Sequence, residues 1–218
     1  MIQWVYERAS SSKLLDSVLV ATDSIEVKSL VESFGGLGIL TSEKHESGTD
    51  RIAEAIEDFP QYDLIVNIQG DEPLLNPKTL DYLIEGFETS LSTPSNSPMG
   101  TLVRRSKEET EVLDPSTVKV AVSKQGRALY FSRSPIPHNR DSIVDVEYYL
   151  HVGVYIYERE FLLEFAQLDN SFLERVEKLE QLRALENSYS IRVFETKETP
   201  IGVDTPEDLE RVRQLLTQ

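Results

Sequence analysis

The stretch Asp63-Leu64-Ile65-Val66-Asn67-Ile68-Gln69, followed at once by Gly70-Asp71-Glu72-Pro73, decides the fold class. Its first part is a nearly continuous apolar run, which is typical of a strand covered on both faces, as in a parallel α/β sheet. Gly70 and Pro73 then favour a turn. Asp71 therefore stands just past the carboxyl end of a buried strand, where open α/β sheets bind their ligands. A simple turn capped by Asp71 explains the same residues.

Before this run, the chain alternates between strand and helix patterns. The apolar runs at residues 17–22 and 38–40 predict two strands, and the helical pattern from Ser24 to Phe34 predicts a helix between them. Ser47-Gly48-Thr49-Asp50 then opens a second helix that extends to about Phe59. This order predicts an α/β domain.

After Pro77, which begins another helix to about residue 87, the pattern changes. Strand candidates at 99–104, 118–123, 128–133 and 152–157 follow one another with few helices between them, which predicts an antiparallel excursion within residues 99–157. Helical patterns at 159–167, 173–186 and 206–216, with a strand at 190–196, complete the chain. We predict a Rossmann-like mixed sheet in a single domain over residues 1–218.

Composition excludes several classes of protein and partner. The chain has 218 residues, 39% of them hydrophobic, so it is long enough to bury a core. It has no cysteine and no signal-like or membrane-spanning run, which makes the cytoplasm the default location and a membrane an unexpected partner. The formal charge of -16 repels polyanions, so we expect no nucleic-acid partner.

A second carboxylate stands near the other end of the chain, in Gly202-Val203-Asp204-Thr205-Pro206. Thr205 suits the N-cap of the last helix, Pro206 its first position and Asp208 a capping box, so Asp204 is not needed by the helix. Mg²⁺ takes one or two carboxylates plus phosphate oxygens and waters, so Asp71 and Asp204 suffice to hold a metal–nucleotide. An aspartate is also common before a helix simply because its negative charge interacts favourably with the helix dipole.

Seven segments in order resemble one family, the 3-deoxy-manno-octulosonate cytidylyltransferases. They are 45–51 (HESGTDR), 66–73 (VNIQGDEP), 114–120 (DPSTVKV), 128–137 (ALYFSR through IP), 151–155 (HVGVY), 179–183 (LEQLR) and 202–209 (GVDTPEDL). The resemblance implies a transfer of CMP from CTP to 3-deoxy-D-manno-octulosonate, a step of lipopolysaccharide biosynthesis, with release of pyrophosphate. It also implies a homodimer that uses the antiparallel excursion for its contact.

The resemblance assigns roles to individual residues. Asp71 and Asp204 match the catalytic aspartates that bind Mg²⁺. The positions that match the cytidine site are Ser47, Gly48, Thr49 and Gln69, and those that match the sugar-acid pocket are Arg133, His151, Tyr155, Glu180 and Gln181. Local reasoning offers plainer roles: Ser47 and Asp50 form a capping box, Glu180 and Gln181 face water on a helix, and His151 is structural.

The chain also departs from the family pattern. Family members begin with a central strand and a loop containing leucine-proline-glycine-lysine-proline that cradles the triphosphate, whereas Met1-Ile2 aligns with the start of the first helix after that loop. We therefore expect neighbouring strands to expose unpaired edges and apolar faces. Two alternatives stay open: a non-catalytic remnant that binds a sugar acid or a partner, and a cytidylyltransferase for another acid sugar, such as sialic acid.

Overall fold

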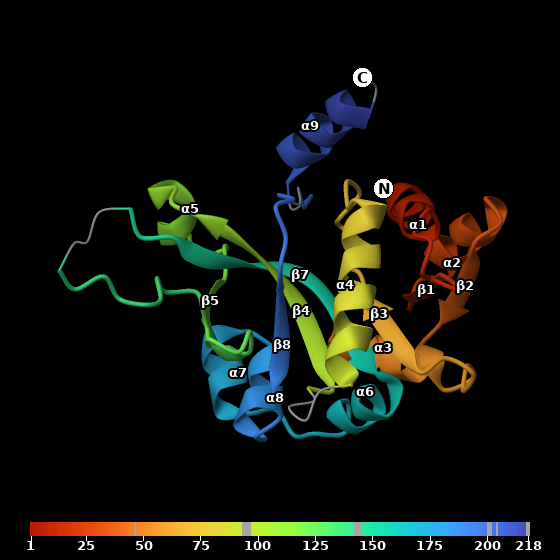
Figure 1. Ribbon diagram of the computed structural model, residues 1–218. Coiled ribbons are helices and arrows are strands. Elements are labelled where there is room, and N and C mark those ends of the chain that lie inside the picture. Colours follow the sequence, from red (N-terminus) through yellow and green to blue (C-terminus); the bar gives the residue numbers. More distant parts are fainter. Residues whose placement is uncertain (46, 93–96, 142–144, 200–201, 204, 217–218) are drawn as a thin grey trace.

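The computed structural model describes residues 1–45, 47–92, 97–141, 145–199, 202–203 and 205–216. It contains a six-stranded mixed sheet flanked by helices and a separate two-stranded sheet near the N-terminus (Figure 1). The predicted mixed α/β fold is therefore confirmed.

The N-terminal part holds α1 (Ile2–Ser10), β1 (Leu19–Thr22), α2 (Ile25–Ser33) and β2 (Leu37–Leu40). Ser24 caps α2 by accepting a hydrogen bond from the backbone N–H of Val27, and Gly35 follows the helix with φ +84°, a conformation that suits glycine. β1 and β2 pair in parallel, as expected for a strand–helix–strand unit.

The larger sheet has the order β6-β5-β7-β4-β8, with β3 also pairing with β7. Its strands are β3 (Leu64–Asn67), β4 (Met99–Ser106), β5 (Lys119–Val122), β6 (Ala128–Ser132), β7 (Tyr148–Glu158) and β8 (Ile191–Glu195). β4 and β8 are parallel, whereas the β4–β7, β5–β6 and β5–β7 pairs have the antiparallel pairing predicted for this stretch.

The apolar run of β3 does not belong to a parallel pair, which corrects the prediction made from it. β3 pairs antiparallel with the end of β7, from Leu64 opposite Glu158 to Asn67 opposite Tyr155. Leu64 to Val66 are partly buried rather than fully covered. An apolar run reports that a strand is shielded from water, but it does not report the direction of the neighbouring strand.

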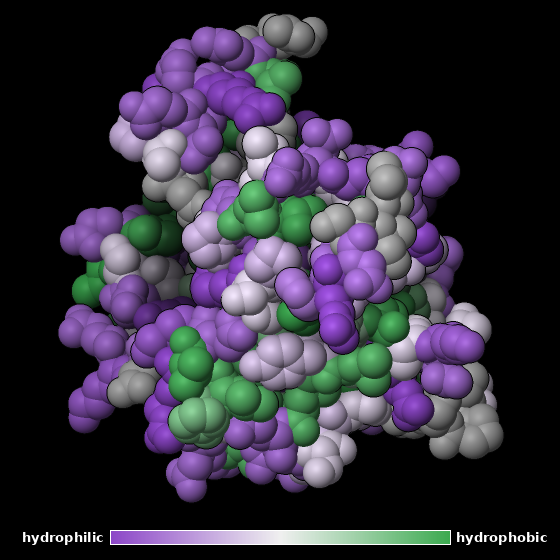
Figure 2. All heavy atoms as spheres, turned by 90° about the vertical axis from the view of Figure 1, so that its left-hand side faces the viewer, coloured by the Kyte–Doolittle hydropathy of each residue, from purple (hydrophilic) through white to green (hydrophobic). Residues whose placement is uncertain are grey.

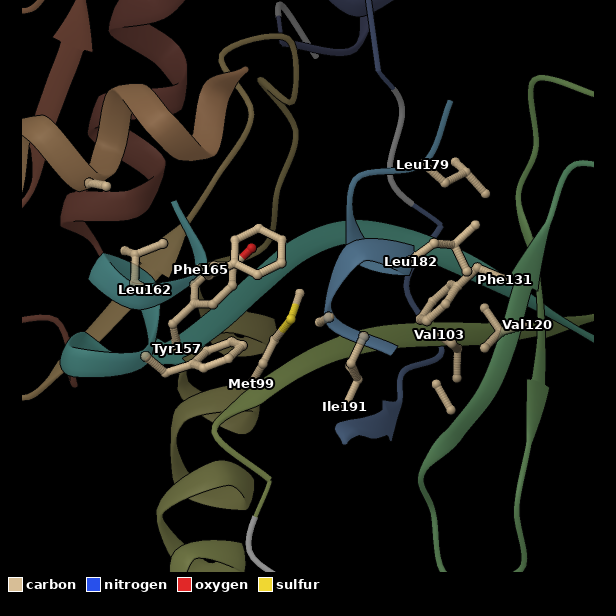
Figure 3. Close-up of a cluster of buried hydrophobic side chains, with 14 of the residues drawn as sticks. Met99, Val103, Val120, Phe131, Tyr157, Leu162, Phe165, Leu179, Leu182 and Ile191 are labelled. Atoms are coloured by element: carbon tan, nitrogen blue, oxygen red, sulfur yellow. The ribbon is translucent and has the colours of Figure 1, made fainter. Parts of the chain in front are cut away.

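Two layers of helices cover the sheet. On one face, α6 (Arg159–Phe165) and α8 (Gln181–Glu186) bury Leu162, Phe165 and Leu182 against Met99 and Val103 of β4 (Figure 3). On the other face, α4 (Pro77–Leu91) packs its own apolar side chains against the alternate residues of β4 and β7. The remaining helices are α3 (Gly48–Ile56), α5 (Glu109–Leu113), α7 (Phe172–Glu177) and α9 (Pro206–Leu216).

The helix predicted over residues 173–186 is two helices. Lys178 ends α7 in the left-handed conformation, with φ 55° and ψ 49°, and α8 begins three residues later. Between them Leu179 is 6% exposed and belongs to the core. In a continuous helix the direction of the Leu179 side chain would be set by the helical period. The break lets this side chain turn into the core instead, which explains why the helix is interrupted there.

A cavity of about 450 Å³ separates β1 from β3. Val18, Val20, Leu64, Val66 and Ile68 are among its largely apolar lining. Within the described ranges, β1 pairs only with β2 and β3 only with β7, so each strand leaves one edge unpaired, as expected from the departure noted above. A search of the described residues finds no helix with the length and apolar character needed to cross a membrane.

Gly100 of β4 lies on the face that α4 covers, where the neighbouring side chains leave no room. A Cβ added there would meet side chains of Phe87, Ile156 and Phe194 at 2.8, 3.0 and 3.1 Å. We expect Gly100→Ala to lower the free energy of unfolding by about 1–3 kcal/mol, because buried rings must move. The matched control is Gly153→Ala in neighbouring β7, where the nearest atom is 4.0 Å away. Chemical denaturation measures both, and equal stabilities would contradict this account of the packing.

Candidate active site

The site lies at a gap in the pairing of β7. β5 and β3 both pair with β7; β5 pairs with Tyr149 and Leu150, and β3 pairs with residues 155–158. The backbone N–H of His151 still donates to the carbonyl oxygen of Val118, just before β5, at 2.8 Å, so residues 152–154 lie between the two partners, and the β4 register shifts there by a bulge. Gln69, just beyond β3, lies beside Gly153, since its Cγ is 4.0 Å from the position of a Cβ there. Predicted residues from distant segments therefore meet at this gap.

The first turn of α3 contributes the next side chains. Ser47 caps the helix by accepting a hydrogen bond from the backbone N–H of Asp50 at 3.1 Å, as predicted, but the Asp50 side chain completes no capping box among the described residues. Thr49 Oγ1 donates to Glu180 Oε2 at 2.6 Å, and the hydroxyl of Ser47, like that of Thr49, lowers the pKa of Glu180. Glu180 therefore does not simply face water, because it joins α8 to the turn that matches the cytidine site.

A buried polar chain continues from Thr49 to β3. The hydroxyl of Tyr157, which is 2% exposed, faces the side chains of Thr49 and Asn67, and both oppose the rise in its pKa that burial causes. Gln69 Nε2 donates to Asn67 Oδ1 at 3.2 Å. The positions matched to cytidine and those matched to the sugar acid are thus joined by neighbouring polar side chains through the core.

His151 and Tyr155 lie on β7 within a row of aromatic rings. The His151 ring is 5.4 Å from Phe131 and 5.2 Å from Tyr155, measured between centroids. Its Nε2 is 2.9 Å from Thr101 Oγ1. Burial lowers the pKa of His151 to about 4 and raises that of the Tyr155 hydroxyl, so both side chains are neutral near pH 7.

The Arg133 side chain is already bound to the backbone. Its Nε, Nη1 and Nη2 donate to the carbonyl oxygens of Glu177, Pro115 and Lys178 at 2.8, 2.9 and 3.3 Å. Arg133 therefore fastens the end of β6 to the break between α7 and α8. Gln181 follows that break, is 3% exposed, and has an Nε2 with no hydrogen-bond partner among the described residues.

Asp71 lies against the segment that precedes α9. The backbone N–H of Val203 donates to the carbonyl oxygen of Asp71 at 2.9 Å. Thr205 and Asp208 form the predicted capping box, with Asp208 N donating to Thr205 Oγ1 at 3.2 Å and Thr205 N to Asp208 Oδ2 at 3.0 Å. Asp204, the other predicted magnesium ligand, lies outside the described residues.

Asp71 provides one of the ligands that a magnesium site needs. In the described part of the chain its carboxylate has no hydrogen-bond or ion-pair partner, and a carboxylate is a ligand that Mg²⁺ prefers. No cluster of three or more acidic, histidine or cysteine residues that suits a metal occurs among the described residues. One or two carboxylates with phosphate oxygens satisfy Mg²⁺, so a larger cluster is not required.

Sequence reasoning gave no role to several side chains that organise the site. They are Asn67, Tyr157, Glu174 and Arg183, and for Asp50 the sequence predicts only a place in a capping box. A signal for Asn67 was present, since it is the one polar residue inside an otherwise apolar strand. Tyr157, Glu174 and Arg183 gave none, because their partners are distant in sequence.

The buried, neutral His151 predicts a stability that depends on pH. Its pKa is about 4 in the folded protein and about 6.5 when unfolded, so the unfolded chain gains the proton first as the pH falls through this window. Between pH 7 and 5 we expect wild type to lose about 1–2 kcal/mol of unfolding free energy more than His151→Gln, whose side chain does not titrate. Urea denaturation of both proteins at pH 7 and pH 5 tests this. Equal losses of unfolding free energy in wild type and His151→Gln would contradict the prediction.

Several known proteins are similar to this chain in sequence or in structure. A family profile described as cytidylyltransferase matches residues 1–193. Two curated proteins named 3-deoxy-manno-octulosonate cytidylyltransferase are similar: one from Solibacter usitatus (48% identity; 99% of this chain, 83% of the relative) and one from Geotalea uraniireducens (47%; 99% and 88%).

A structure of CMP:2-keto-3-deoxy-manno-octonic acid synthetase complexed with CTP is similar, with TM-score 0.92 and 42% identity. The alignment covers 100% of this chain and 87% of that one. A 4-diphosphocytidyl-2C-methyl-D-erythritol synthase from Anaerococcus prevotii, with TM-score 0.63 and 15% identity, shares the fold alone. With nearly its whole length matched at this identity, the chain belongs to the cytidylyltransferase family, among the 3-deoxy-manno-octulosonate cytidylyltransferases.

Proposed function

We propose that this protein transfers CMP from CTP to 3-deoxy-manno-octulosonate and releases pyrophosphate. The observation that carries the proposal is the buried path of neighbouring polar side chains from Gln69 through Tyr157 and Thr49 to Glu180. It joins the positions matched to the two substrates within a chain 42% identical to a CTP-bound synthetase of this sugar acid.

The chain's own side chains supply positioning and selective hydrogen bonding. A Cβ built at Gly48 would meet nothing within 4 Å, so the first turn of α3 leaves open space for a close approach to its backbone. Glu180, Gln181 and Tyr155 offer acceptors and donors to sugar hydroxyls, and neutral His151 adds no charge beside them. A magnesium ion at Asp71, with Asp204 as second ligand, would neutralise charge on the phosphoryl oxygens and acidify the attacking hydroxyl.

Two simple measurements distinguish this proposal from its two alternatives. A non-catalytic remnant would bind CTP little or not at all in calorimetry, whereas an enzyme should bind it in the micromolar to millimolar range typical of substrates. A cytidylyltransferase for another acid sugar would consume sialic acid in a competition with 3-deoxy-manno-octulosonate. Within this proposal the protein works in the cytoplasm.

Pyrophosphate release tests the reaction and its metal together. We expect release from CTP and the sugar acid with Mg²⁺, loss of it with EDTA, and a fall of at least about 100-fold in kcat for Asp71→Asn, because phosphoryl charge would be poorly neutralised. Asp169→Asn, at an exposed position, is the matched control and should retain activity. The assay is run on this chain and on a form preceded by the N-terminal segment of the Solibacter usitatus relative.

Absence of pyrophosphate from both forms would refute the proposed reaction. Pyrophosphate release that persists in EDTA would refute the requirement for a metal ion. Release from the longer form alone would support the reaction and show that the added segment supplies groups that this chain lacks.

We also propose a homodimer, with its contact on α7 and not on the antiparallel excursion over residues 99–157 that the resemblance implies. Phe172 and Val176 project from the same side of α7 and are 63% and 64% exposed. Figure 2 shows the side of the molecule on which α7 lies, and hydrophobic side chains gather in the lower half of that view. Exposed apolar groups that lie together mark interaction surfaces more often than chance.

Sedimentation equilibrium tests the dimer. We expect a mass near twice 24.8 kDa for wild type and a shift toward monomer for Val176→Asp, because a buried charge would oppose association. Leu30→Asp on α2, where the leucine is 51% exposed, is the control and should stay dimeric. A monomeric wild type contradicts the dimer, and a dimeric Val176→Asp contradicts this surface.

A further inference from the structure

Arg183 of α8 is a buried cation behind the site. The residue is 3% exposed, and its Nε and Nη2 donate to the two carboxylate oxygens of Glu174 at 2.9 and 2.6 Å. Its guanidinium carbon also lies 5.0 Å from the centre of the Phe165 ring. This two-point contact holds the planar guanidinium in one orientation.

Two further carboxylates face the same cation at longer range. Arg183 Nη2 is 3.7 Å from Glu180 Oε1, and Nη1 is 3.9 Å from Asp50 Oδ1. Both oxygens are buried and have no hydrogen-bond partner among the described residues. Three carboxylates therefore surround one cation, and two of them keep acceptor capacity that a hydroxyl-bearing ligand can satisfy.

We propose that Arg183 is a positioning residue that fixes the Glu180 carboxylate to receive hydroxyl groups of the sugar acid. The inference rests on the function proposed above. Thr49 holds Glu180 Oε2 from the side of α3, and Arg183 attracts Oε1 from 3.7 Å, which is longer than a hydrogen bond and leaves the acceptor capacity of Oε1 for the ligand. Glu174 acts one step further out by orienting Arg183.

The charges around Glu180 support this arrangement. Burial raises the pKa of Glu180, whereas the hydroxyls of Ser47 and Thr49 and the charge of Arg183 lower it, and Asp50 raises it. Tyr155 and Tyr157 face it from β7 as neutral hydroxyls. Removing the Arg183 charge would therefore move protonation of Glu180 to higher pH, and a protonated carboxyl accepts hydrogen bonds less well.

A double-mutant cycle tests the proposal in the pyrophosphate assay. We expect Arg183→Gln to raise the KM for the sugar acid about tenfold and to leave the KM for CTP within about twofold, because one charge-assisted contact is lost on the sugar side. Glu180→Gln should do at least as much. The double variant should be no worse than Glu180→Gln alone, because Arg183 acts through Glu180.

The pH dependence of kcat/KM separates the positioning role from a general loss of structure, which would not shift the pH at which kcat/KM falls. As the pH is lowered, kcat/KM for the sugar acid should fall at higher pH in Arg183→Gln than in wild type, and Glu180→Gln should lack this limb. Arg183→Lys should restore part of the wild-type profile by restoring the charge. An unmoved acid limb, or additive losses in the double variant, would overturn the positioning role.

If Arg183→Gln does not unfold cooperatively and is therefore not properly folded, Glu174→Gln provides the decisive test instead. It should raise the sugar-acid KM several-fold by loosening Arg183, while Glu160→Gln, at an 89% exposed side chain, should not. An unchanged sugar-acid KM in a folded Glu174→Gln refutes the inference alone. A wild-type protein without pyrophosphate release in either form refutes the proposed function, and this inference with it.

Discussion

The sharing of β7 by two partner strands is the constraint on which the site depends. β5 pairs with the start of β7 and β3 with its end. Because each backbone group of a buried strand needs a partner, the residues between the two pairings are where the sheet can open to a ligand. Gly153 lies in that interval, His151 borders it, and Gln69 reaches it from the end of β3.

Buried polar groups then tie this opening to the helices. Tyr157, Thr49 and Glu180 form one path through the core, and Arg183 ends it at α8. Burying such groups is costly unless they satisfy one another, so the network specifies a single arrangement of α3, β3 and α8. Its excess of carboxylates over cations leaves acceptors for hydroxyl donors, which suits the polyhydroxylated substrate that we propose.

The N-terminal unit is joined to the larger sheet less firmly. β1 and β3 face the same cavity without pairing in the described ranges, and contact between the two parts comes largely from α1 against α4 and from α3 against β1. Gly48 and Gln69, two of the residues matched to the cytidine, also line that cavity, as does Arg51. Few strand contacts across this boundary predict a region of lower local stability than the core around Phe165 and Leu182.

Most of the helices and strands, the caps at Ser47 and Thr205, and the family can be predicted from the sequence, because they depend on local periodicity, short hydrogen bonds and motif order. The short helix α5, the direction of β3, the break at Lys178 and the partners of Glu180 do not follow from local pattern. The last three appear only in the folded protein, because each depends on what packs against the segment from elsewhere in the chain. An apolar run, a helical period or a lone arginine carries no information about what packs against it.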